Sequence, residues 1–248
     1  MRGMQMSNIL IGIIAAVDPE IEAVKQEMKN PNCRRIFELE FWSGLIGGEQ
    51  CVCVKSGVGK VNAARAAQIM IDNYSNLKYM FNVGTAGGLD ICQKAGDLII
   101  SESLVQVDYD RSALGNAPAH IPNLKSAYIA SDPKLLDICR QTIDKMKDYP
   151  HNIYSGIIAT ADIFKLSAEK RDEIINLHKA LCFEMEGAAI AHVCELCQIP
   201  FVAVRSVTNF LSGQASDEEE FWKYRKYASE CCARFIQHFC ILLSENPQ

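Results

Sequence analysis

The chain has 248 residues, of which 49% are hydrophobic and 22% charged, with a net charge of −5 and a pI near 5.6. This balance is typical of a globular protein with a sizeable core. The negative charge argues against a nucleic-acid or membrane surface as the main partner, and no apolar run approaches the roughly 20 residues that span a bilayer. The apolar N-terminal stretch lacks a convincing cleavage site, so we interpret it as a buried strand and expect residues 1–8 to be disordered or tag-like.

The eleven cysteines lie mostly in apolar or helical contexts and not in turns. That pattern indicates buried free thiols in a reducing compartment, so we expect a cytoplasmic protein. Cys194 and Cys197 form a CxxC on a helical pattern with no second pair nearby. Core packing is therefore favoured over a metal or redox role for this pair.

Apolar runs rich in β-branched residues alternate with helical patterns along the chain. In chain order the pattern predicts a strand at 8–17, a helix at 18–28, a hairpin at 35–57 turning at Gly47-Gly48, a helix at 60–74, strands at 79–84 and 97–103, a helix at 132–146, a strand at 152–160, helices at 167–178 and 186–197, a strand at 200–207 and a long helix at 217–243. Asp18 is a candidate N-cap, with Pro19 in the first turn.

No internal repeat or linker interrupts this alternation. We therefore expect a single α/β domain over residues 1–248, with a mixed sheet. The segment 109–126 is too long for a plain connection and is a candidate lid or subunit contact.

Ligands gather at strand ends in open α/β folds, and four strand ends here carry polar or glycine-rich residues. The first is "AAVDPEIE", whose acids alone fit a helix dipole. The second is "GTAGGL", whose glycines let backbone N–H groups approach a ligand, although it matches neither GxGxxG nor a P-loop. "KSGVGK" is a similar tight turn between a strand and a helix.

The third strand end is "CFEMEG", where Glu184 and Glu186 flank Met185. Buried acids are costly unless they meet hydrogen-bond donors, and sugar hydroxyls are suitable donors. The fourth is "VRSVTNF", which we expect to end as a strand at Thr208 and Asn209. The aromatic side chain in "ATADIFK" follows another strand end, but taken alone it fits core packing better than a stacking role.

The order of these pieces resembles one family. A Glu after "GIIAAV", then "SGVGKVNAA", "GTAGGL", "TADIF", "FEMEGAAIAHV" and "VRSVTN", are similar to the 5′-methylthioadenosine/S-adenosylhomocysteine nucleosidases of the purine nucleoside phosphorylase/uridine phosphorylase superfamily. The match runs from about Ile9 to the C-terminal helix. The resemblance implies a nucleoside phosphorylase-like fold of three α/β/α layers with a central mixed sheet, and a homodimer. It also implies a small purine nucleoside as substrate, and cofactor-free, metal-free hydrolysis of an N-glycosidic bond.

The resemblance also assigns roles to residues. Glu20 falls where the general base orients and deprotonates water, and Glu186 where a carboxylate grips the ribose hydroxyls. The remaining matched positions line or support the site: Met185 against the sugar, Thr85 near ribose and water, Glu184 and Arg205 as polar supports, Phe164 stacked on the base, the Lys165 backbone and Thr208 at the purine edge, and Val17 and Val58 on the walls. Leu114 falls where the neighbouring subunit lends a residue to the alkylthio end.

The chemistry of glycosidic cleavage is consistent with these roles. The reaction builds oxocarbenium character on the ribose and negative charge on the departing base, so it needs a positioned water, carboxylates facing the sugar and a proton donor at purine N7. A phosphorylase would present arginines or similar donors to phosphate, whereas an acid here would repel it. The sequence therefore favours hydrolysis over phosphorolysis.

Position 209 departs from the family pattern, because Asn209 stands where the family has the Asp that protonates N7. A carboxamide donates a hydrogen bond but transfers no proton, and general acid catalysis contributes about 10²–10⁴-fold. Three explanations remain open: an engineered, impaired variant; a native Asn that reads a 6-oxopurine, in a nucleosidase or phosphorylase; or a non-catalytic nucleoside-binding relative. The 5′-substituent preference is likewise left open, because it depends on loop residues such as Leu114.

Overall fold

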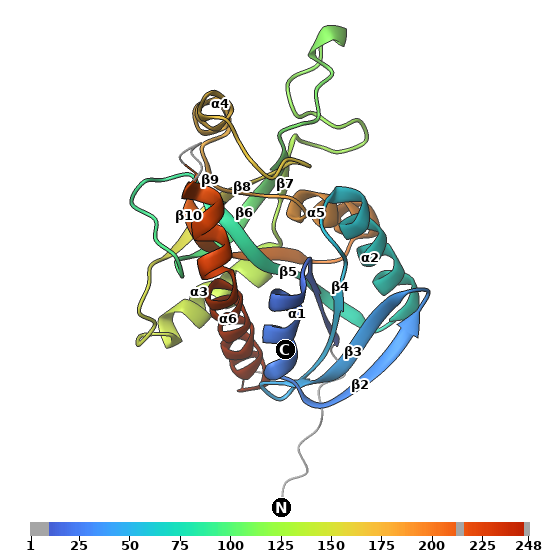
Figure 1. The fold of residues 1–248 in the computed structure, drawn as a ribbon. Coiled ribbons are helices and arrows are strands. Elements are labelled where there is room, and N and C mark those ends of the chain that lie inside the picture. Colours follow the sequence, from blue (N-terminus) through green and yellow to red (C-terminus); the bar gives the residue numbers. More distant parts are fainter. Residues whose placement is uncertain (1–9, 212–215, 246–248) are drawn as a thin grey trace, which may run out of the picture.

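The computed structural model describes residues 10–211 and 216–245, so the expectation for residues 1–8 lies outside the described residues. The elements alternate along the chain much as the sequence pattern predicts (Figure 1). They are β1 (Leu10–Ala15), α1 (Asp18–Gln26), β2 (Lys29–Ile36), β3 (Leu39–Ile46), β4 (Glu49–Lys55), α2 (Lys60–Asn73), β5 (Leu77–Gly88), β6 (Leu98–Gln106), the 3-10 turn η1 (Ser112–Leu114), β7 (Tyr128–Ala130), α3 (Pro133–Lys145), β8 (Ile153–Thr160), α4 (Ala168–His178), β9 (Ala180–Glu184), α5 (Gly187–Cys197), β10 (Phe201–Phe210) and α6 (Ser216–Glu245).

One mixed sheet contains the ten strands of the described residues, in the order β10-β6-β8-β9-β5-β1-β4-β3-β2, with β7 paired to β6 and a further pairing of β10 with β5. Strands β1, β4, β5 and β10 run parallel to one another within this sheet. Their carboxyl ends therefore meet at one edge, which is where polar groups gather in such folds.

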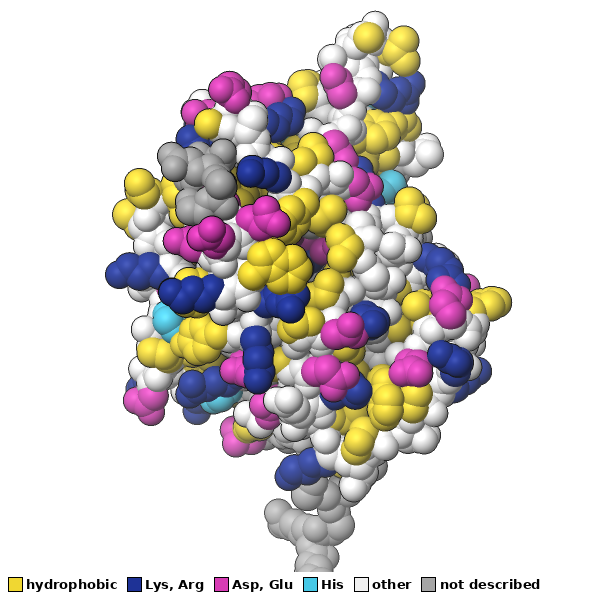
Figure 2. Space-filling view, in the orientation of Figure 1, with side chains coloured by type: hydrophobic (Ala, Val, Ile, Leu, Met, Phe, Trp, Pro, Cys, Tyr) yellow, Lys and Arg dark blue, Asp and Glu magenta, His cyan; other side chains and the backbone are white. Residues whose placement is uncertain are grey.

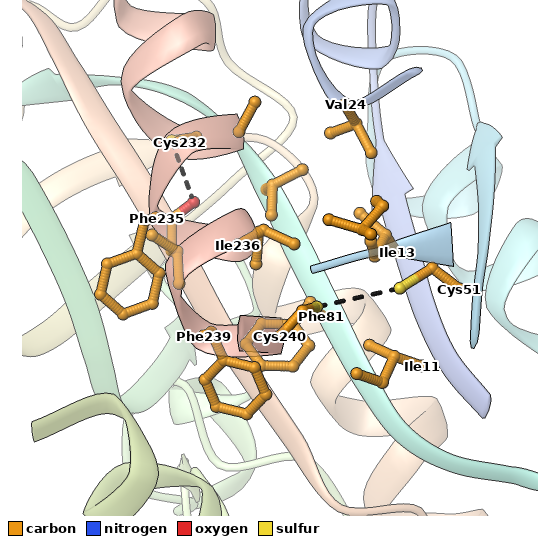
Figure 3. Close-up of a cluster of buried hydrophobic side chains, with 14 of the residues drawn as sticks. Ile11, Ile13, Val24, Cys51, Phe81, Cys232, Phe235, Ile236, Phe239 and Cys240 are labelled. Carbon is orange, nitrogen blue, oxygen red and sulfur yellow. Dashed lines mark hydrogen bonds between the residues drawn. The ribbon is translucent and has the colours of Figure 1, made fainter. Parts of the chain in front are cut away.

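Helices cover both faces of the sheet, which confirms the three-layer α/β/α prediction. On one face α1, α3 and α6 bury a cluster that includes Ile13, Phe81 and Phe239 (Figure 3). On the other face the alanines of α2 and the small residues of α5 pack closely against the strands. Burial of these apolar side chains supplies most of the stabilisation, at roughly 25 cal/mol per Å².

The cysteines follow the prediction of free thiols packed inside the protein. All eleven are free, and eight of them are buried. Cys194 of the CxxC is buried in the core, whereas Cys197 is partly exposed and its sulfur lies 3.7 Å from the Gln68 side-chain oxygen. Two others, Cys33 and Cys92, are exposed.

Several predicted boundaries were wrong. Strand β10 does not stop at Thr208 and Asn209 but continues to Phe210, and β5 runs through "GTAGG" to Gly88, because the two strands stay paired up to Phe210 and Gly88. The predicted glycine turn is thus part of a strand. Asp18 is not the N-cap of α1 either, since the helix begins at Asp18 and the cap position is Val17.

The predicted hairpin turns at Gly47-Gly48 as expected, and both glycines have positive φ. The sequence analysis missed β2, an exposed edge strand that pairs with β3 through a turn at Phe37. It also missed the three-residue strand β7. Between β6 and β7 the chain from 107 to 127 projects from the body of the molecule, with η1 as its only regular element in that described stretch (Figure 1).

Candidate functional site

A pocket opens at the carboxyl ends of β1, β5, β9 and β10, beside the loop after β8 and the start of α6. Apolar side chains gather near the centre of the face shown in Figure 2, which is the face that carries these strand ends. The lining residues are Ala16, Val17, Glu20, Val58, Thr85, Ala86, Gly87, Ile163, Phe164, Lys165, Leu166, Phe183, Glu184, Met185, Glu186, Thr208, Asn209, Leu211, Asp217, Glu218 and Phe221. Most predicted site residues therefore surround one cavity.

Glu20 is buried at the wall of this pocket and its carboxylate is held by hydrogen bonds on both oxygens. Oε2 accepts from the backbone N–H of Ala16 at 2.9 Å and of Val17 at 3.2 Å. Oε1 accepts from the backbone N–H of Thr85 at 2.8 Å and from its hydroxyl at 3.0 Å. Because these donors come from the ends of β1 and from β5, the carboxylate lies where those two strands meet.

Gly84 makes this arrangement possible by leaving space beside Glu20. A Cβ at this position would lie 2.7 Å from Oε1 of Glu20 and 2.5 Å from Nη1 of Arg205. Both distances are shorter than van der Waals contact allows. The glycine that the sequence analysis placed in a turn therefore serves a strand that passes close to two charged side chains.

Glu184 is also buried, and its carboxylate is fully engaged by the protein. Oε2 accepts from the backbone N–H of Glu186 and of Gly187, each at 2.8 Å, and from the Arg205 guanidinium. Oε1 accepts from the Thr160 hydroxyl. Glu184 thus satisfies the first N–H groups of α5, which have no partner within the helix, and it acts as a structural acid.

Arg205 does not line the pocket but lies buried behind it, in contact with Glu184 and with Glu186 at 3.4 Å. Its guanidinium also donates to Asn82 and to the Thr85 carbonyl. Burial alone would lower the pKa of Arg205, but the neighbouring glutamates outweigh that effect and raise it. A permanent cation therefore sits between the acids and makes their burial tolerable.

Glu186 stands at the N-cap position of α5 and lines the pocket. Oε1 accepts from the backbone N–H of Gly59 at 2.9 Å, while Oε2 faces Arg205. Burial raises the pKa of Glu186 to about 7, with Arg205 opposing the shift and Glu184 adding to it. This carboxyl therefore titrates near neutral pH, unlike an ordinary surface glutamate.

Thr208 and Asn209 form the pocket wall at the end of β10. The Thr208 hydroxyl lies 2.7 Å from Oδ1 of Asn209 and 3.2 Å from the carbonyl oxygen of Ala86. Asn209 itself is 5% exposed. A buried carboxamide at a pocket wall can read a polar edge of a ligand by hydrogen bonds, but it cannot move a proton.

The apolar part of the pocket includes a small aromatic cluster. The rings of Phe164 and Phe221 meet edge to face with centroids 5.3 Å apart, and Trp222 packs on Phe221 at 5.2 Å. Phe164 keeps 52% of its surface exposed, and Val58 keeps 46%. These exposed faces leave apolar area for a flat ring system to cover.

Two predicted site residues do not line the pocket: Arg205, which lies behind it, and Leu114. It is 71% exposed in η1, on the projecting segment. Conversely, the sequence analysis missed Phe183, Leu211, Asp217 and Phe221, which line the pocket. Phe183 and Leu211 lie on β9 and directly after β10, whereas only the way α6 packs beside β10 brings Asp217 and Phe221 to the site.

Among residues 10–211 and 216–245, no three or more His, Cys, Asp or Glu side chains are placed to hold a metal ion. Within the same ranges no helix, α6 included, combines the length and apolar character required to cross a bilayer.

The fold and the acidic pocket agree with the comparisons to known proteins. The chain matches the family model of the phosphorylase superfamily over residues 10–244. It is 32% identical over 213 residues to the "5′-methylthioadenosine/S-adenosylhomocysteine nucleosidase" of Tolumonas auensis, covering 85% of this chain and 91% of that protein.

Solved structures give the same result. The chain resembles the nucleosidase of that name from Neisseria meningitidis, in complex with methylthio-immucillin-A, with a TM-score of 0.86, 29% identity and coverage of 93% of this chain and 97% of that one. It also resembles the nucleosidase from Colwellia psychrerythraea 34H in complex with adenine, with a TM-score of 0.89, 28% identity and coverage of 96% and 97%.

The fold and the site define a member of the phosphorylase superfamily. Within that superfamily, the chain belongs to the family of 5′-methylthioadenosine/S-adenosylhomocysteine nucleosidases. The resemblance noted from the sequence is therefore confirmed at the level of family and fold.

Proposed function

We propose that this chain hydrolyses the N-glycosidic bond of 5′-methylthioadenosine and S-adenosylhomocysteine, releasing adenine and the thioribose product. The observation that carries the proposal is the pair of buried carboxylates, Glu20 and Glu186, that line one pocket in a chain of this family. An oxocarbenium-like sugar is stabilised by nearby carboxylates, and an attacking water needs a base.

In the proposed mechanism Glu20 orients and deprotonates the water. Its Oε1 is occupied by Thr85, whose hydroxyl can rotate to make room for the water. Glu186 accepts hydrogen bonds from the ribose hydroxyls, and Met185 packs against the sugar. Glu184 and Arg205 position Glu186 without contacting the substrate.

The base occupies the opposite part of the pocket in this proposal. Phe164 stacks on the purine, Val17 and Val58 cover it, and the Lys165 backbone with Thr208 and Asn209 reads its polar edge. Asn209 donates a hydrogen bond to N7 but supplies no proton. Loss of general acid catalysis costs about 10²–10⁴-fold, so we expect tight binding with slow turnover.

Water is the proposed nucleophile in preference to phosphate. Arg205 is buried behind the pocket and engaged by Glu184 and Glu186. A phosphate in the pocket would have to approach the carboxylates of Glu20 and Glu186, which is electrostatically unfavourable.

A second candidate is a 6-oxopurine nucleoside, handled by hydrolysis or phosphorolysis. The Thr208 hydroxyl lies at hydrogen-bonding distance from Oδ1 of Asn209, and this orientation turns the NH₂ group of the carboxamide away from Thr208. An NH₂ group can donate both to N7 and to a 6-oxo group, whereas a 6-amino group requires an acceptor. A protein that only binds nucleosides is the third possibility, and the assay below separates it.

Assembly and location belong to the same proposal. We infer a homodimer, because Leu114 is exposed on a projecting segment while the pocket is open beside the exposed Phe164 and Val58. In the dimer Leu114 would cover the alkylthio end of the neighbouring site. Free buried thiols support a cytoplasmic enzyme of methionine salvage. One sheet running from residue 10 to 210 supports a single domain.

Base release from methylthioadenosine, adenosylhomocysteine and inosine tests the proposal, measured with and without phosphate for this chain and for Asn209→Asp. Fast, phosphate-independent adenine release by Asn209→Asp is the expected result. A preference of the parent chain for inosine would favour the second candidate. Tight binding without turnover in either form would establish a binding protein.

A further inference from the structure

Two carboxylates from distant parts of the chain bind the N-terminal end of α2. Its N-cap residue, Gly59, has no side chain with which to cap the helix. Instead, the N–H of Gly59 donates to Oε1 of Glu186 at 2.9 Å, and the N–H of Lys60 donates to Oδ1 of Asp162 at 2.8 Å. These N–H groups have no partner within the helix, and the helix dipole favours negative charge beside them.

A third acid, Asp108, closes this arrangement into a ring. The Lys60 ammonium donates to Oδ1 of Asp108 at 2.6 Å, and the N–H of Asp162 donates to Oδ2 of Asp108 at 3.1 Å. Asp108 and Asp162 each lie two residues beyond the last pair of the β6–β8 ladder, Gln106 and Thr160. The ladder therefore brings both acids to the same end of the sheet.

The Lys60–Asp108 ion pair differs from the surface pairs of this protein in its burial. The two side chains keep only 19% and 22% of their surface exposed. By contrast, Lys55 and Asp18 form a pair of similar length with 47% and 75% exposed. A shielded pair interacts more strongly than an exposed one, because water and salt screen it less.

We propose that Lys60, Asp108 and Asp162, here called the α2 clamp, position the nucleoside-binding groups of the pocket. The clamp holds the Gly59 N–H against Glu186 and holds the loop after β8, on which Phe164 lies. None of the three clamp residues lines the pocket, so they act as positioning residues. The inference rests on the proposed function, because it concerns the ribose and base contacts of that site.

The clamp also ties the pocket to the projecting segment. Asp108 is the second residue of the connection from β6 to β7, six residues before Leu114. The acid that fixes this segment at its base is therefore the acid that binds Lys60 and Asp162. Displacing the start of this segment therefore moves Glu186 and the loop after β8, which carries Phe164, together.

Removing the Lys60 ammonium leaves Asp108 and Asp162 as two neighbouring carboxylates without that cation. Their repulsion separates the loop after β8 from the segment after β6, and the first turn of α2 shifts away from Glu186. Contacts to ribose and purine made equally in the ground state and the transition state then weaken. Such a loss raises Kd and KM and leaves kcat nearly unchanged.

Isothermal titration of 5′-methylthioadenosine tests the clamp in the full chain. We expect Lys60→Met to raise Kd about tenfold, the effect of 1.4 kcal/mol, and Lys60→Arg to restore most of the affinity. Lys55→Met is the matched control, because it removes a lysine from an exposed ion pair near the same turn. We expect its Kd to equal that of the parent chain.

Asp108→Asn keeps the shape of the side chain, so it tests the clamp even if Lys60→Met does not fold. Lys60 and Asp162 donate to different oxygens of Asp108, so the single carboxamide oxygen can replace only one of these two acceptors, and we expect an intermediate Kd. In the Lys60→Met/Asp108→Asn double variant, the two effects should be less than additive. In the Asn209→Asp background, KM and kcat for adenine release can be measured for each clamp variant. We expect KM to rise and kcat to stay nearly unchanged.

The outcomes separate the two proposals. If the parent chain and Lys60→Met bind methylthioadenosine equally well, the clamp proposal is wrong and the proposed function stands. Additive effects in the double variant would have the same meaning. Weakened binding by Lys55→Met to the same extent as Lys60→Met also overturns the clamp proposal. A parent chain that binds no nucleoside overturns the proposed function and the clamp with it.

Discussion

The hydroxyl of Thr85 donates a hydrogen bond to Oε1 of Glu20 at 3.0 Å, and the backbone N–H of the same residue donates to the same oxygen at 2.8 Å. Both oxygens of Glu20 therefore face donors, three of which are backbone amides that cannot turn away. The hydroxyl is the donor that can rotate, so it marks where an attacking water can reach this carboxylate.

Glu20→Gln should abolish hydrolysis and destabilise the fold. Its NH₂ group would face either two backbone N–H groups or the N–H and hydroxyl of Thr85, so at least one hydrogen bond is replaced by opposed donors. A buried group left without its partner costs about 1–3 kcal/mol. Urea unfolding and base release measure the two effects.

Glu22→Gln is the matched control for this prediction, because Glu22 lies on the same helix with 55% of its side chain exposed and pairs only with Lys25 among the contacts described for it. We expect no change in activity and little in stability. Equal turnover in the parent and Glu20→Gln would remove Glu20 from the mechanism.

The pH dependence of stability should report on Glu186. Burial raises the pKa of its carboxyl to about 7 in the folded chain, from an ordinary value of 4.5. A raised pKa means that the proton stabilises the folded state at low pH, and this contribution is lost as the pH rises through 7. Glu186→Gln keeps a neutral group at every pH, so it should gain stability relative to the parent between pH 5 and pH 8.

The expected gain is of the order of 3 kcal/mol at most, since one pKa unit corresponds to about 1.4 kcal/mol. Urea unfolding of both chains at pH 5, 6.5 and 8 measures it. A stability difference that stays constant over this range would show that Glu186 keeps an ordinary pKa. The same substitution should weaken nucleoside binding, because the amide cannot accept hydrogen bonds on both of its terminal atoms.

The family motifs in the sequence predicted much of the site. Glu20, Thr85 and Glu186 were placed by motif order alone. They line one pocket because β1, which leads into α1, runs parallel to β5, and the end of β9 pairs with β5 at Gly87 and Gly88. Local pattern also gave the alternation of strands and helices, since burial on one face imposes a period of 3.6 on each helix.

Other features depended on tertiary structure. Phe221 reaches the pocket only because α6 packs along β10, and the sequence of an amphipathic helix does not say which residue meets which strand. The edge strand β2 escaped notice because its exposed, charged sequence lacks the apolar alternation of a strand. "GTAGG" looked like a turn, but pairing with β10 keeps it extended.

Gly84→Ala should displace the charged side chains of Glu20 and Arg205. The added methyl group would lie 2.5 Å from Nη1 of Arg205 and 2.7 Å from Oε1 of Glu20, so both charged groups must move. Arg205 is buried among carboxylates, and disrupting a buried ion pair costs about 3–5 kcal/mol. We expect a lower midpoint of urea unfolding and at least tenfold weaker nucleoside binding. A variant with the stability and affinity of the parent would contradict this account of the strand.

Thiol reactivity should separate the cysteines by burial. The sulfurs of Cys51 and Cys240 lie 3.9 Å apart between β4 and α6, inside the apolar cluster of Figure 3. The contact with Cys240, followed by burial, raises the pKa of Cys51 well above its usual range. Burial likewise raises the pKa of Cys53 to about 12.

Because the thiolate is the reactive species, these thiols should resist a disulfide reagent such as Ellman's reagent in the native protein at pH 8. Cys33 and Cys92, which are exposed, should react within the mixing time, and the partly exposed Cys197 should react more slowly. The other eight should react only when urea unfolds the chain, at a rate that follows unfolding. Peptide mapping after brief labelling identifies the modified residues. Early labelling of Cys51 or Cys240 would show that α6 separates from β4 in the native state, and a Cys51→Ser/Cys240→Ser double variant, which keeps both volumes, would then show whether that opening depends on the sulfur contact.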